Sequence, residues 1–232
     1  MSILGLTLDY GPFGFLDRYD PAHICNHSDV NGRYSYINQP QIAWWNLYRL
    51  GEALSELATK EEIMSTLDNF ATYFDQYYLA AMGNKLGINN FSFDDLDLLK
   101  ELLTILQHSG ADWTIFWRKL SHITLDNPHI ILDYVTDRKE LSQWLGKYLA
   151  RRQQQDLDFD QSKQLMLTSN PAIVLRNHLV HNAIEKAKHK DFTEIERLFN
   201  ALTTPYIEQE DFIDYYNYPP DWAADISLSY SS

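Results

Sequence analysis

The residues best suited to chemistry stand close to the start of the sequence. An apolar run from Ile3 to Leu8 leads into the tripeptide Asp9-Tyr10-Gly11. A carboxylate is an oxygen ligand for a hard cation such as Mg²⁺, an aromatic ring can fix the backbone beside it, and glycine permits a sharp turn. In phosphoryl-transfer enzymes a carboxylate in this setting holds the metal ion on the nucleotide phosphates. The tripeptide alone is common by chance, and by itself it favours a strand that runs into a tight turn.

Longer motifs downstream favour the first interpretation. They are Tyr19-Asp20-Pro21-Ala22-His23-Ile24-Cys25-Asn26-His27-Ser28-Asp29, Gly32-Arg33-Tyr34-Ser35-Tyr36-Ile37-Asn38-Gln39-Pro40, Trp45-Asn46-Leu47, Asn170-Pro171, Leu175-Arg176-Asn177, Asp191-Phe192, Pro219-Pro220-Asp221-Trp222 and Ser231-Ser232. Together with the tripeptide they resemble the selenoprotein O family, which comprises pseudokinase-like proteins that transfer AMP from ATP to protein hydroxyls. The resemblance runs from end to end of the chain and is weaker over residues 60–165.

The resemblance implies a protein-kinase-like fold, of which this chain would supply the C-terminal lobe and a helical extension. We therefore expect a mainly α-helical chain with a short N-terminal β segment. Residues 1–40 would form the metal-binding turn and the following loop of the active site. Residues 41–232 would form the helical lobe and the extension as one structural unit, without the N-terminal lobe.

The family's roles carry over to a single residue of this sequence. Asp9 matches the metal ligand of the family, so it would bind Mg²⁺ or Mn²⁺ and, through the metal, the co-substrate ATP. A Ser, Thr or Tyr hydroxyl of a target protein would then attack the α-phosphorus, and pyrophosphate would leave. No catalytic base is expected within this chain, because the resemblance places it upstream of Met1 together with a nucleotide-binding lobe.

Asp9 by itself is not expected to sustain this reaction. The sequence contains no glycine-rich phosphate loop followed by a strand lysine, and one carboxylate holds a magnesium nucleotide weakly. We therefore expect the isolated chain to be inactive and to need a missing N-terminal half. The alternative is a helical interaction module without catalysis.

Composition narrows the partners and the compartment. The chain has 32 Asp and Glu against 19 Lys and Arg, a formal net charge of −13, which disfavours a nucleic-acid partner. No stretch approaches the roughly 18 consecutive apolar residues of a membrane span, so no membrane partner is expected. The single cysteine, Cys25, cannot form an internal disulfide, and this favours a reducing, cytoplasmic location.

Past residue 40 the apolar residues recur with a helical period. Capping signals at Thr59, Ser92, Asp112 and Asp137 predict where helices begin, and Gly110 predicts where one ends. A stop is also predicted at Gly83-Asn84. Two later helices are predicted over residues 172–188 and 193–202, the second with a capping box from Thr193 to Glu196.

The tract 151–155 and the acidic residues of the tail, from Glu208 to Asp225, are interpreted as solvated surface. Most of the tryptophans are expected in the core.

Two histidine clusters could bind a metal ion. His23, Cys25 and His27 alternate, so an extended segment would place them on one face with Asp29 next in line. We favour a hydrogen-bonded loop here, because the family resemblance implies no structural zinc. His178, His181 and Glu185 could share one face of a helix, and we interpret the histidines as a surface pair.

The remaining predictions concern support and control of the active site. Arg33 and Asn38 are candidates for bracing the segment that carries Asp9, since a positioned carboxylate needs supporting partners. Many family members end in a Ser-Cys-Ser-Ser-like sequence with a proposed redox role, whereas Tyr230 stands at the matching place here. A phenol cannot form a disulfide, so we expect no thiol-dependent control.

Overall fold

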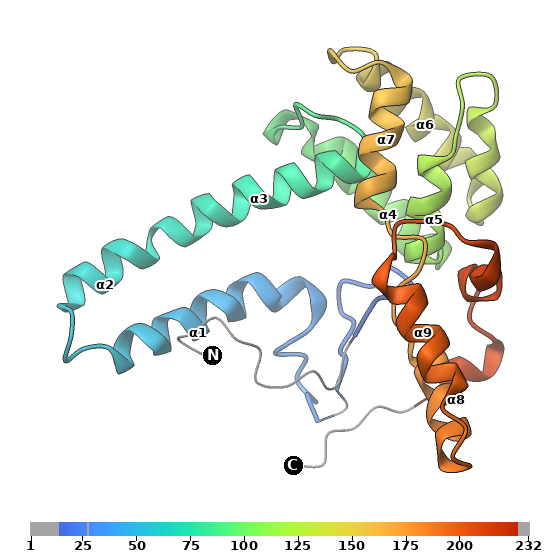
Figure 1. Cartoon of the computed structure of the whole chain (residues 1–232). Coiled ribbons are helices and arrows are strands. Elements are labelled where there is room, and N and C mark those ends of the chain that lie inside the picture. The colour runs from blue at the N-terminus through green and yellow to red at the C-terminus, as the bar shows by residue number, and fades with distance from the viewer. Residues whose placement is uncertain (1–13, 27, 227–232) are drawn as a thin grey trace. The chain divides into compact units, whose positions relative to one another are not determined.

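A computed structural model describes residues 14–26 and 28–226, and the chain over these ranges is mainly helical (Figure 1). The α-helices are α1 (Gln39–Ala53), α2 (Lys60–Leu67), α3 (Asn69–Leu86), α4 (Leu96–Ser109), α5 (Trp113–Ser121), α6 (Arg138–Arg152), α7 (Phe159–Ser169), α8 (Asn177–Lys188) and α9 (Thr193–Thr203). Short 3₁₀ helices are η1 (Tyr36–Asn38), η2 (Phe93–Asp95), η3 (Pro128–Tyr134), η4 (Glu210–Tyr216) and η5 (Asp221–Asp225). The mainly α prediction is confirmed, and the predicted β segment before Asp9 lies outside the described residues.

The chain divides into two compact units. The described part of the first unit consists of Gly14, residues 20–26 and residues 28–78, and it contains η1, α1, α2 and the first half of α3. The second unit consists of residues 15–19 and 79–226, and it contains the end of α3 and all later helices. The five residues that follow Gly14 thus belong to the same unit as the carboxyl-terminal helices.

Side-chain caps begin several helices where the sequence predicts them. Thr59 accepts a hydrogen bond from the Glu62 amide, and the Glu62 carboxylate accepts one from the Thr59 amide at 2.8 Å, which completes a capping box for α2. Ser92 and Asp95 form the same box before α4. Asp112 accepts from the Ile115 amide at 2.9 Å, so it caps α5. These caps satisfy amide groups that have no partner within the helix.

Helices α3 and α4 each end next to a glycine that has a left-handed backbone. Gly110 ends α4 with φ of 58°, as predicted. The predicted stop at Gly83-Asn84 is wrong, because α3 continues to Leu86 and ends before Gly87, whose φ is 67°. Gly83 has a packing role instead: a Cβ atom there would lie 2.5 Å from the Phe91 Cβ atom.

The structure differs from the predicted helices at three further places. Helix α7, which begins with a capping box between Asp158 and Gln161, is absent from the predicted set. The helix predicted over residues 172–188 begins only at Asn177. Thr193 lies inside α9 without capping it, and its amide and hydroxyl donate to Asp191.

The core of the second unit is built around large aromatic side chains. Helix α4 packs against α6, and α5 packs against α7 (Figure 1). Trp117, Trp144 and Tyr148 are fully buried among the leucines and isoleucines of these helices. The prediction that tryptophans fill the core is confirmed for Trp117 and Trp144. It is wrong for Trp44 and Trp222, which are 38% and 43% exposed.

The tract 151–155, predicted as solvated surface, begins within the last turn of α6. The prediction holds for Gln153 and Gln154, which are exposed, and is wrong for the two arginines before them. Arg151 donates to the buried Asp95 at 2.5 Å and 3.0 Å, and Arg152 is 5% exposed. Burial opposes the charge of Asp95, but the hydrogen bonds from Arg151 and Ser92 lower its pKa below the ordinary value. The basic residues at the end of α6 therefore tie this helix to its neighbours.

Gly87 and Gly110, which both have a left-handed backbone, allow a matched test of the packing. A Cβ atom at Gly110 would meet nothing closer than 3.7 Å, so Gly110→Ala should lower the free energy of unfolding by about 1 kcal/mol, the cost of the left-handed backbone. A Cβ atom at Gly87 would lie 2.4 Å from the Ser162 Oγ atom and 2.9 Å from the Met166 Cγ atom. Gly87→Ala should therefore cost at least about 1 kcal/mol more. Urea denaturation of both variants measures this difference, and equal losses would contradict the packing described here.

Candidate functional site

The predicted metal ligand Asp9 lies outside the described residues, as do His27 and Tyr230. The structure describes residues 14–26 and 28–226, so it shows how the segment that follows the Asp9-Tyr10-Gly11 motif is held. Gly14 packs directly on Cys25, because a Cβ atom at Gly14 would lie 2.5 Å from the Cys25 Cβ atom. The second glycine of the Gly11-Pro12-Phe13-Gly14 sequence is thus required by a close approach within the first unit.

Residues 15–19 are anchored at the beginning of α5. The backbone oxygen of Asp17 accepts a hydrogen bond from the Trp113 amide at 2.9 Å, and Arg18 forms an antiparallel bridge with Asp112. The ring of Tyr19 stacks on Trp113 with centroids 5.1 Å apart. Leu16 is 6% exposed. Backbone, aromatic and apolar contacts together fix this segment on the second unit.

A buried arginine strengthens this anchor. Arg176 donates from both terminal nitrogens to Asp112, at 2.7 Å and 2.9 Å, and from Nη1 to Asp17 at 2.8 Å. Arg176 is 4% exposed and Asp112 is 7% exposed. Burial opposes the charge of Arg176, but the hydrogen bonds and charges of Asp112 and Asp17 raise its pKa above the ordinary value. Bidentate pairing of this kind fixes geometry as well as charge.

The sequence gives Arg176 no role beyond its place in the Leu175-Arg176-Asn177 motif. Arg176 and Asp17 lie 159 positions apart along the chain, so no local pattern joins them. The motif was the one signal that could have pointed to this arginine.

The loop of residues 20–38 is stabilised within the first unit by its own polar groups. Asp29 accepts hydrogen bonds from the amides of Arg33 and Tyr34 at 2.8 Å and 2.7 Å. Asn38 donates to the backbone oxygen of Gly32 at 3.1 Å. The guanidinium carbon of Arg33 lies 4.4 Å from the centroid of a Trp45 ring. Arg33 and Asn38 thus support this loop, and their action on Asp9 stays a prediction.

The structure tests the two histidine clusters only in part, because His27 lies outside the described residues. Across residues 14–26 and 28–226, no group of three His, Cys, Asp or Glu side chains could hold a metal ion. The backbone of His23 accepts a hydrogen bond from the Tyr36 amide at 2.9 Å, in keeping with a hydrogen-bonded loop.

The predicted surface pair of His178 and His181 is wrong in part, because His178 is 7% exposed. Both rings contact Trp222, with centroids 6.3 Å and 5.6 Å away. Burial, followed by the nearby charge of Arg176, lowers the pKa of His178 below its ordinary value. His178 is therefore a neutral packing residue near pH 7.

Asn170, from the Asn170-Pro171 motif, is another buried anchor. Its amide nitrogen donates to the Lys85 backbone oxygen and to the Ser121 Oγ atom, both at 2.9 Å. Its side-chain oxygen accepts from the Lys85 Nζ atom at 2.8 Å. Asn170 is fully buried, so it joins the end of α3 to α5 at the point where α7 ends.

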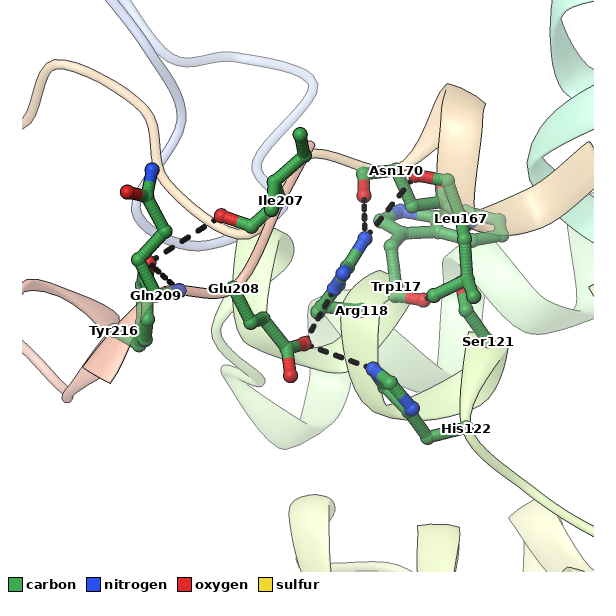
Figure 2. A network of polar contacts seen from close by, with 10 residues as sticks. All are labelled: Trp117, Arg118, Ser121, His122, Leu167, Asn170, Ile207, Glu208, Gln209 and Tyr216. Atoms are coloured by element: carbon green, nitrogen blue, oxygen red, sulfur yellow. Dashed lines mark hydrogen bonds and ion pairs between the residues drawn. The ribbon is translucent and has the colours of Figure 1, made fainter. Parts of the chain in front are cut away.

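Arg118 holds the chain around Asn170 and the tail together. Figure 2 shows its guanidinium between the carboxylate of Glu208 and the backbone oxygens of Leu167 and Asn170. The Arg118 Nε atom lies 2.6 Å from Glu208, and the His122 Nε2 atom lies 2.8 Å from the same carboxylate oxygen. Glu208 lies at the surface as predicted, with its side chain 45% exposed, but it is ion-paired as well. These residues tie the tail to α5.

Lys85 should make stability depend on pH. Burial lowers the pKa of Lys85 from 10.5 to about 8, while its Nζ atom lies 4.7 Å from the centroid of the Trp117 ring. Between these two pH values the unfolded chain retains the lysine proton that the folded protein has lost, so the free energy of unfolding should rise with pH. Relative to Lys85→Met, the wild-type chain should gain stability between pH 7.5 and pH 9.5 in urea denaturation. A constant difference between the two proteins would contradict this.

The comparisons with known proteins assign the family. The family described as "Protein adenylyltransferase SelO" matches residues 1–203, which is most of the chain. The chain belongs to the SelO family. Relatives named "Protein nucleotidyltransferase YdiU" are 44% identical in Variovorax paradoxus, 42% in Yersinia pseudotuberculosis and 41% in Cupriavidus metallidurans. Each of these matches covers the whole chain.

The SelO match confirms the family that the sequence motifs predict. The chain spans about half the length of these relatives, between 46% and 48%. Among the described residues, no helix is long and apolar enough to cross a membrane. The SelO motifs at Asn170 and Arg176 are buried anchors, and the SelO segment after Gly14 is attached to one of them.

Proposed function

We propose that this chain is one half of a protein adenylyltransferase with a kinase-like fold, which moves AMP from ATP to Ser, Thr or Tyr hydroxyls of proteins. Asp9 binds the Mg²⁺ or Mn²⁺ that accompanies ATP. The observation that carries the proposal is the SelO match over residues 1–203, which includes the Asp9-Tyr10-Gly11 motif. The names of the relatives, protein nucleotidyltransferases, point to the same class of reaction.

The donor chemistry fits such a metal. Mg²⁺ is commonly bound by one or two carboxylates together with substrate phosphates, and Asp9 offers one carboxylate. When bound at Asp9, the ion would offset the negative charge that develops during transfer. The cation also favours the ionised form of Asp9.

The contacts of residues 15–19 support a role of this chain in positioning Asp9. A carboxylate that binds a metal ion in an active site must be held within a fraction of an ångström of its working position, and this requires rigid neighbours. Residues 15–19 begin six positions after Asp9 and are held by Asp112, Trp113 and Arg176. We propose that this anchor limits the movement of the Asp9 turn. AMP transfer would also need catalytic groups from the part of the relatives that this chain does not match.

A helical interaction module is the second candidate. Helices α8 and α9 pack together and leave apolar side chains exposed on their surface, with Phe199 68%, Ile184 50% and Ile195 45% exposed. Exposed apolar groups of this kind can mark a protein-binding surface. This function would require no nucleotide.

Labelled ATP distinguishes the two candidates. We define the joined protein as this chain connected to the part of the Yersinia pseudotuberculosis relative that the chain does not match. ATP labelled at the α-phosphate should label protein in the presence of the joined protein, whereas ATP labelled at the γ-phosphate should not. The chain alone should give no label above background. If the joined protein transfers only the γ-label, or no label at all, the adenylyltransferase proposal is wrong.

A further inference from the structure

Arg152, at the end of α6, is a buried cation without an acidic partner. It is 5% exposed, and none of the ion pairs among residues 14–26 and 28–226 includes it. Other arginines of the second unit with a well-covered side chain each bind a carboxylate: Arg118 binds Glu208, Arg151 binds Asp95 and Arg176 binds Asp112. Buried charges in proteins are generally paired, so the counter-charge of Arg152 needs an explanation.

The hydrogen bonds of Arg152 leave part of its guanidinium without an acceptor. Nη2 donates to the Ser162 Oγ atom at 2.5 Å and to the Phe159 backbone oxygen at 3.4 Å. The guanidinium carbon lies 4.0 Å from the centroid of the Phe159 ring and 5.5 Å from that of Tyr148. Nε is buried without a hydrogen-bond partner in the described structure. The aromatic faces offset only part of the cost of burying a charge.

Arg152 lines a pocket of about 250 Å³ in the second unit. The apolar walls are Leu125, Leu149, Leu157 and Phe159. A volume of this size equals that of about eight water molecules in the liquid, at about 30 Å³ each. A small organic molecule therefore fits.

The other buried polar groups around this pocket already have partners. Ser162 donates to the Gly87 oxygen at 2.6 Å, and Gln155 donates to the same oxygen at 2.8 Å. Asp158, the carboxylate in the lining, is exposed and accepts from the Gln161 amide at 2.8 Å. The guanidinium of Arg152 is thus the buried group that still lacks a counter-charge.

We propose that this pocket binds a small monocarboxylate with an aliphatic arm. One cation matches one negative charge, and the leucine and phenylalanine walls would cover the hydrocarbon arm. Inorganic phosphate carries more charge and has no apolar part, so it fits this lining less well. This site is independent of the adenylyl-transfer proposal.

Hexanoate is a suitable probe, and hexanol is its neutral counterpart. In isothermal titration at constant ionic strength, hexanoate should bind the 232-residue chain at least about tenfold more tightly than hexanol or inorganic phosphate, because a charge-assisted hydrogen bond contributes about 1.5 kcal/mol or more. Equal binding of hexanoate and hexanol, stronger binding of phosphate, or no binding of hexanoate would overturn the proposal.

Two variants locate the binding site. Arg152→Met should abolish the preference for hexanoate over hexanol. Because Arg152→Met could also unfold the chain, Leu125→Glu provides a second test: Leu125 is 62% exposed, so the substitution should leave the fold intact while it places a competing carboxylate at the pocket. Leu125→Glu should weaken hexanoate binding at least about tenfold, and the matched Leu125→Gln should weaken it less. Unchanged binding in folded Leu125→Glu would place hexanoate elsewhere and refute the site.

Discussion

Asparagine in place of Asp9 is expected to lower the rate of AMP transfer by the joined protein about 100-fold or more. The amide has nearly the same shape as the carboxylate but no negative charge, so it would hold the metal on the phosphates poorly. A metal ion contributes several kcal/mol to catalysis of this kind, and about 3 kcal/mol corresponds to a factor of about 100. Incorporation of α-labelled AMP into protein, measured over a fixed time, gives the rate.

Asp97→Asn is the matched control for this substitution. The side chain of Asp97 is 96% exposed, and its contact with Lys100 at 3.3 Å lies on the surface of α4. AMP transfer should stay within about twofold of the wild-type rate, since exposed pairs of this kind contribute little. Equal losses in the two variants would mean that Asp9 has no special part in the reaction.

Arg176→Met is expected to give the largest loss of stability among the substitutions discussed here, about 3 to 5 kcal/mol of the free energy of unfolding. The change would leave the buried carboxylate of Asp112 without its bidentate partner and would release Asp17. Removing one member of a buried pair costs this much because the remaining charge stays buried and unpaired. Guanidinium denaturation of the 232-residue chain, followed by the fluorescence of its tryptophans, measures the loss.

Arg138→Met is the control for Arg176. Arg138 pairs with Asp133 on the surface, and the two side chains are 59% and 61% exposed. This substitution should change the free energy of unfolding by no more than about 0.5 kcal/mol. A loss below about 1 kcal/mol for Arg176→Met would show that the buried pair does not hold residues 15–19 in place.

Local signals in the sequence were sufficient for much of the helical structure. A cap such as Thr59 or Asp112 acts on amides within a few residues, and a left-handed glycine such as Gly110 ends a helix through its own backbone. These features can be predicted because cause and effect lie close together in the chain. Gly83 was misassigned because its neighbour Phe91 belongs to a later turn that the helical pattern does not reveal.

The polar anchors could not be predicted from local patterns. Arg176 meets Asp17 and Asp112, and Arg118 meets Glu208 90 positions away. From the sequence alone, a charged residue in a polar stretch is most simply interpreted as solvated surface, as residues 151–155 were. Among these anchors, the family motifs did point to Asn170 and Arg176. For Asp9, the sequence motif predicts a metal-binding role that the described residues do not test.

Binding of Mn²⁺ to the joined protein tests the central claim most directly. Free Mn²⁺ gives a strong electron paramagnetic resonance signal that decreases when the ion is bound. Because ATP itself binds Mn²⁺, the titration is compared with a protein-free titration at the same ATP concentration, and the difference gives the affinity of the protein without any need for turnover. The account predicts that Asp9→Asn weakens Mn²⁺ binding at least about tenfold, since it removes a charged ligand, and that Asp97→Asn does not. The same affinity in wild type and Asp9→Asn would contradict the assignment of Asp9 as the metal ligand.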